Sequence, residues 1–178
     1  MRQAGYEFLV HPAHIDEDTT PLRLLPIELA RFLSAEKARE VARVYPDDVV
    51  LAADTVVAFG DRALGKPVDV EDARHMLMLL SGTTHIVITG ITLICSSRGL
   101  EQTRTVMSAV KMRRLRTSQI EQYLAGGQWA GKAGGYGIQD RDPFVTRMSG
   151  SLSNIVGMPM EATAELLASV GVVPTRLA

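Results

Sequence analysis

The sequence predicts an α/β domain in which helices flank a mixed β-sheet. Apolar, β-branched runs of strand length alternate with segments in which apolar residues recur at helical spacing. Hairpin-like pairs of strands also appear along the chain, which is typical of α/β and α+β folds. The 178 residues suffice for one domain with a proper core, or for one core with a small lobe.

The first half of the chain contains two predicted helices and one long predicted strand. Pro26 can occupy the first turn of the first helix, and Pro46 ends it. Asp69 can cap the second helix. In chain order we expect an extended run over 6–10, a helix over 27–44, a buried strand over 49–59, a returning segment over 63–67 and a helix over 70–80.

The second half begins with two β-like runs, 85–95 and 101–111, joined by a short polar turn. Thr117 opens a helix that Gly126 and Gly127 close. We expect a glycine-rich segment over 131–139, an extended run over 144–148 and a final helix over 160–170.

Composition excludes several functional classes. The formal net charge of −1 does not predict a nucleic acid as the main partner. No apolar stretch is long enough to span a bilayer, and the N-terminus lacks the apolar centre of a signal peptide. We therefore expect a cytoplasmic protein. Cys95, the one cysteine, lies in an apolar run and is interpreted as a buried thiol.

Asp54 is the sharpest chemical signal, because it is the one charged residue in the run 49–59. A carboxylate in an apolar strand costs several kcal/mol unless something offsets that cost. Such a group is paired, bound to a metal or catalytic. A buried salt bridge and a strand-end carboxylate remain the structural alternatives.

Three lysines give a second signal, since a compact ammonium group suits phosphate oxygens. Lys37 lies on the first predicted helix, whereas Lys66 and Lys132 each follow a glycine. The runs 60–67 and 126–133 both match G-x-x-x-x-G-K, but proline or alanine replaces the hydroxyl residue that would hold Mg²⁺. We reject both as P-loops.

His11 and His14 precede an acidic run over 16–18. Their spacing matches no zinc pattern. Asp16 and Glu17 could instead support a divalent cation that substrate phosphates mainly hold, as Mg²⁺ prefers.

Nine short segments, taken in order, resemble the Maf family over nearly the whole chain. They are Gly5–Phe8, Ile15–Glu17, Ala35–Ala38, Ala53–Val57, Gly65–Pro67, Ser81–His85, Thr89–Gly90, Gly131–Gln139 and Ser153–Pro159. The resemblance implies a single domain over residues 1–178, with two lobes around a central cleft and the architecture of the inosine-triphosphate pyrophosphatases. It also implies a cytoplasmic, often dimeric enzyme of nucleotide metabolism.

The same resemblance implies a hydrolase acting on acid anhydrides, which cuts the α–β phosphoanhydride of a nucleoside triphosphate with the help of Mg²⁺ or Mn²⁺. Asp54 would be the proton acceptor, and Glu17 would join it at the metal. Lys37 and Lys66 would bind phosphate. Thr55 and Gln139 would stand at positions tied to base choice, and the segment 133–139 resembles the branch that prefers dTTP and UTP.

Family members begin with a strand and a loop of the form S-x-S-P-R-R, which precede the segment that here starts at Gly5. We expect that this strand and loop are missing, leaving a sheet edge or a groove unfilled. A rival hypothesis follows, in which a Maf-like protein binds nucleotides or regulates septum formation without turnover.

Overall fold

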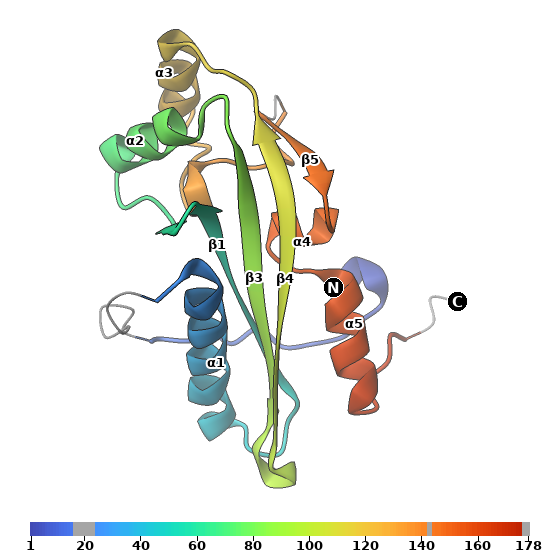
Figure 1. Cartoon of the computed structure of the whole chain (residues 1–178). Coiled ribbons are helices and arrows are strands. Elements are labelled where there is room, and N and C mark those ends of the chain that lie inside the picture. Colours follow the sequence, from blue (N-terminus) through green and yellow to red (C-terminus); the bar gives the residue numbers. More distant parts are fainter. Residues whose placement is uncertain (16–23, 142–143, 176–178) are drawn as a thin grey trace.

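The computed structural model describes residues 1–15, 24–141 and 144–175. A five-stranded sheet of order β2-β1-β3-β4-β5 forms its centre (Figure 1). The strands are β1 (Val50–Phe59), β2 (Arg62–Leu64), β3 (Thr84–Cys95), β4 (Leu100–Met112) and β5 (Val145–Ser149).

All four strand pairings in the described part of the chain are antiparallel, so this sheet lacks the parallel pairs of a mixed sheet. The reason is that each strand after β1 starts at the end of the sheet where the earlier strand that it pairs with finished. The α/β class itself, with helices against a sheet, is confirmed.

Among the described residues, five α-helices flank the sheet, and the four that the sequence predicts are confirmed. They are α1 (Pro26–Val44), α2 (Val70–Leu80), α3 (Thr117–Ala125), α4 (Leu152–Val156) and α5 (Met160–Ser169). The Asp69 side chain accepts a hydrogen bond from the Asp72 backbone at 2.8 Å, which confirms the expected cap of α2. The sequence did not predict α4, which is five residues long. The run 6–10 pairs with none of the described strands.

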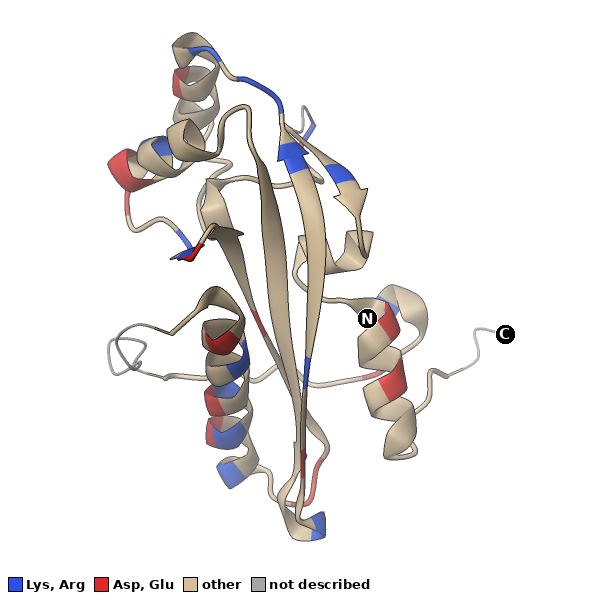
Figure 2. Ribbon diagram, viewed as in Figure 1, with Lys and Arg blue, Asp and Glu red and all other residues tan. Residues whose placement is uncertain are grey.

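The two faces of the sheet bury different helices. On one face, α1 packs against Val50, Val56, Ala58 and their neighbours on β3. The other face carries two separate apolar clusters, one with α2 and α3 at Val57 and one with α5 at Leu51. Charge is scarce across the long strands and frequent on the helices (Figure 2).

The approach of α1 to the sheet depends on a glycine in β3. A Cβ at Gly90 would lie 2.2 Å from the carbonyl oxygen of Ala30 and 2.8 Å from Oγ of Ser34, both on α1. Real Cβ atoms do not come that close to backbone. Gly90 therefore lets the helix backbone press directly on the strand.

One buried hydrogen bond ties the glycine-rich segment after α3 to the sheet. His85 Nε2 lies 2.6 Å from the hydroxyl of Tyr136, and both residues are buried. His85 Nδ1 has no hydrogen-bond partner among the described residues. Burial lowers the pKa of His85 to about 4 and raises that of Tyr136. His85 is therefore neutral at pH 7.

Replacing Gly90 with alanine should destabilise the protein by about 1–3 kcal/mol or more, because α1 must move away from β3. Urea unfolding of wild type and variant measures the difference. Gly65→Ala is the matched control, since its Cβ would meet nothing within 4 Å. Equal midpoints for Gly90→Ala and wild type would show that α1 does not press on this glycine.

Acid should weaken the fold through His85. The unfolded chain binds this proton more tightly than the folded chain, so the stabilisation is complete above pH 6.5 and is lost as the pH falls toward about 4. The loss is at most on the order of 3 kcal/mol. Urea midpoints between pH 7 and 4.5 should fall less steeply in His85→Gln than in wild type, whereas His75→Gln, at an exposed position, should follow wild type.

Candidate active site

A pocket of about 340 Å³ lies at the side edge of β1. β2 pairs only with residues 57–59 of β1, so the stretch 50–56 has no partner on that side among the described strands. Residues from both faces of β1 therefore reach the pocket. Its lining comprises Lys37, Ala53, Asp54, Thr55, Val57, Lys66, Val87, Gly131, Lys132, Ala133, Tyr136, Gly137, Gln139, Ile155, Val156 and Gly157.

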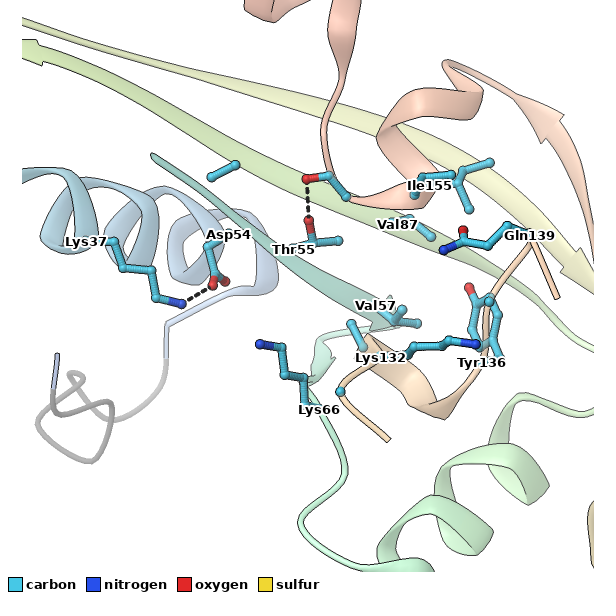
Figure 3. A pocket seen from close by; sticks show the side chains of 16 residues that line it. Lys37, Asp54, Thr55, Val57, Lys66, Val87, Lys132, Tyr136, Gln139 and Ile155 are labelled. Carbon is cyan, nitrogen blue, oxygen red and sulfur yellow. Dashed lines mark hydrogen bonds and ion pairs between the residues drawn. The ribbon is translucent and has the colours of Figure 1, made fainter. Parts of the chain in front are cut away.

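Asp54 faces α1 and forms an ion pair there. Its Oδ1 lies 2.5 Å from Nζ of Lys37, and the two side chains keep 14% and 20% of their surface exposed (Figure 3). Asp54 is also the register partner of Gly90, the residue that admits α1. The close packing of α1 thus brings Lys37 within reach of the carboxylate. Asp54 therefore forms a salt bridge, which was the structural alternative, and it also lines a pocket.

Positive charge predominates in the lining. Lys37, Lys66 and Lys132 stand against Asp54, the one carboxylate among the described lining residues. In the part of the chain that the structure describes, Lys66 forms no ion pair, whereas Lys132 pairs with Asp140. The electrostatics suit an anionic ligand such as a phosphate chain.

Thr55 faces the opposite side of β1, as strand alternation predicts. Its Oγ1 lies 2.9 Å from Oγ1 of Thr89. It also lies 3.5 Å from the carbonyl oxygen of Gly157 (dashed line at Thr55 in Figure 3). Gly157 ends α4 in the left-handed conformation. Asn154 anchors this short helix through its amide, which donates to Val87 O at 3.1 Å and to Ser108 Oγ at 2.9 Å.

The residues present fit a divalent metal only with help from a ligand. No group of three or more metal-ligating side chains occurs within residues 1–15, 24–141 and 144–175. Mg²⁺ often takes one or two carboxylates and obtains its other ligands from phosphates and water. Asp54 can supply one such carboxylate. His11 lies outside the pocket lining, and its Nδ1 is 3.2 Å from the Tyr45 hydroxyl.

Five of the six site residues expected from the sequence line this one pocket, namely Lys37, Asp54, Thr55, Lys66 and Gln139. Glu17, the sixth, lies outside the described residues, as does Asp16. The pocket walls at Tyr136 and at Ile155–Gly157 were not named as site residues. The glycines around Tyr136 and the serine–asparagine run before Ile155 are the local signals that mark these two turns.

A family model described as Maf-like protein matches residues 1–170. A dTTP/UTP pyrophosphatase of Rhizobium meliloti (strain 1021) is 46% identical over an alignment of 182 positions, which covers 96% of this chain and 86% of that protein.

Two further relatives bear the same name. The protein of Caulobacter vibrioides is 47% identical and covers 93% of this chain and 85% of its own length. That of Paramagnetospirillum magneticum is 48% identical, with coverage of 93% and 87%. The chain therefore belongs to the Maf-like protein family.

Proposed function

We propose that this chain hydrolyses dTTP and UTP to the nucleoside monophosphate and pyrophosphate. The observation that carries the proposal is that Asp54, Lys37 and Lys66 share one pocket with a preponderance of positive charge. The printed names of relatives that are 46–48% identical support the same reaction.

Asp54 would act as the proton acceptor in this reaction. A water molecule beside its carboxylate gives up a proton to Asp54 while its oxygen attacks the α-phosphorus. The bond from the α-phosphorus to the bridging oxygen breaks, and pyrophosphate leaves with that oxygen. Lys37 and Lys66 offset the negative charge that would otherwise repel the incoming oxygen.

We infer that a divalent cation, Mg²⁺ or Mn²⁺, accompanies the substrate, held by its phosphates together with Asp54 and Glu17. When bound, the cation would neutralise phosphate charge and polarise the phosphoryl oxygens. Asp54 lies in the pocket where such a cation would be needed.

Thr55 and Gln139 would contact the nucleobase. Gln139 can both donate and accept hydrogen bonds, as a pyrimidine edge requires. In Figure 3, Gln139 and Tyr136 lie at one end of the pocket and Asp54 and Lys37 at the other, which supports separate places for the base and the phosphates.

We further infer a single-domain cytoplasmic homodimer whose partner is the small nucleotide and neither nucleic acid nor membrane. The family resemblance supports the single domain, the dimer and the location, and the formal charge of −1 supports a partner other than nucleic acid. Among the described residues, no helix combines the length and apolar character that crossing a bilayer requires. On the sheet face opposite to α1, the cluster of α2 and α3 and the separate cluster of α5 support two lobes around a cleft.

Asp54→Asn should fold but lose about 10²–10⁴-fold in turnover, because the amide cannot accept the water proton. Pyrophosphate release from dTTP with Mg²⁺ or Mn²⁺ is the measurement. Asp61→Asn, in the exposed turn after β1, is the matched control. Equal rates for Asp54→Asn and wild type would remove Asp54 from the mechanism. Binding of dTTP by wild type without product would favour the non-catalytic rival.

Lys66→Met should raise KM for dTTP roughly tenfold or more, since one charge-assisted contact to the triphosphate is lost. Steady-state kinetics at fixed Mg²⁺ measure this. Lys111→Met removes an exposed lysine that does not line the pocket and should leave KM unchanged. An unaltered KM in Lys66→Met would place the phosphates elsewhere.

A further inference from the structure

The loop between α3 and β5 supplies much of the pocket wall without the support of a strand or a long helix. Within the described part of this loop, the backbone forms one short 3₁₀ turn, at Ala133–Gly135. Six of its residues line the pocket: Gly131, Lys132, Ala133, Tyr136, Gly137 and Gln139. A loop with this task needs contacts that fix its shape.

Asp140, which follows Gln139 in the loop, has three hydrogen-bond donors around its carboxylate. Oδ1 forms an ion pair with Nζ of Lys132. Oδ2 accepts from the Tyr123 hydroxyl at 2.7 Å and from the Gly137 backbone N–H at 3.0 Å. The Asp140 side chain is only 9% exposed, and a buried charge is costly unless it is paired. The three donors offset that cost.

The loop backbone closes tightly over this ion pair. A Cβ at Gly137 would lie 2.8 Å from Oδ1 of Asp140 and 3.0 Å from Nζ of Lys132. The backbone N–H of Asp140 also donates to Gly137 O at 3.3 Å. The pair therefore fixes where Gly137 lies, and with it the short stretch that presents Gln139.

Two pocket side chains depend directly on this arrangement. Lys132 lines the pocket (Figure 3), and its ammonium group is held against Asp140. Gln139 also lines the pocket and is joined to Asp140 by a peptide bond. Tyr123 belongs to α3 and anchors the carboxylate to the helical layer.

We propose that Asp140 is a positioning residue for the base-binding end of the pocket, acting by fixing Lys132 and Gln139. The inference rests on the proposed function. Asp140 does not line the pocket, so its effect on the substrate passes through these two neighbours. If Lys132 and Gln139 are no longer held in place, substrate binding must order them, which weakens binding. The chemical step at Asp54 stays largely intact.

The test is a double-mutant cycle with Asp140→Ala, Lys132→Met and the double variant. Each single variant should raise KM for dTTP roughly tenfold, with kcat within about threefold of wild type. The double variant should be no worse than the more impaired single variant, because the two side chains act as one unit. The preference for dTTP over dCTP should fall in Asp140→Ala.

The matched control is Glu121→Gln. Glu121 lies on the same helix as Tyr123, and the change breaks its exposed ion pair with Arg74 of α2. It should leave KM and base preference unchanged. Unfolding midpoints are measured for all variants. An Asp140→Ala variant that is less stable but has wild-type KM and base preference would reduce Asp140 to a structural role and overturn the proposal. Additive effects of the two single variants on KM would overturn it as well.

The dissociation constant of dTTP, measured by calorimetry with the same variants, separates the two hypotheses. A wild type that binds dTTP without hydrolysis, combined with weaker binding in Asp140→Ala, rejects the proposed reaction and supports the positioning role. An active wild type, combined with unchanged dTTP binding in the variants, supports the proposed reaction and rejects the positioning role. A wild type that neither binds nor hydrolyses dTTP rejects both.

Discussion

The packing of α1 on Gly90 is the constraint on which the site depends. Because this glycine has no side chain, the helix backbone reaches the sheet at Ala30 and Ser34. Lys37 lies two turns further along α1 than Ala30, and Asp54 is the register partner of Gly90 on the neighbouring strand. The ion pair between them is therefore a consequence of backbone packing and does not need a specialised loop.

The second determinant is the short reach of β2. Since β2 covers β1 only at 57–59, no described strand pairs with that edge of β1 beside Asp54 and Thr55. Neighbouring strand residues point to opposite faces, and an edge is where both can border one cavity. The loop after α3 and the end of α4 then complete the wall from the side of the sheet opposite to α1.

Local pattern was enough to predict most of this architecture. The apolar run around Asp54 identified both β1 and the carboxylate, and the caps at Asp69 and Gly126 gave helix limits within about one residue. The antiparallel pairing of β1 with β3 depends on contacts between distant segments, which no local pattern contains. The sequence did not predict α4, because five residues show too little periodicity. It did not indicate Asp140 either, because only the fold brings its partners Tyr123 and Lys132 together.

The pair of hydroxyl groups at Thr55 and Thr89 has a further consequence. Their oxygens are 2.9 Å apart, so one hydrogen atom lies between them and one hydroxyl must accept. When Thr89 donates, the hydrogen of Thr55 is available to a carbonyl in the pocket. When Thr55 donates, Thr89 can turn its own hydrogen toward Asn154 O, 3.5 Å away, and Thr55 offers a lone pair instead. Two rotating hydrogens thus let the Thr55 hydroxyl face the pocket either as a donor or as an acceptor while every heavy atom stays in place.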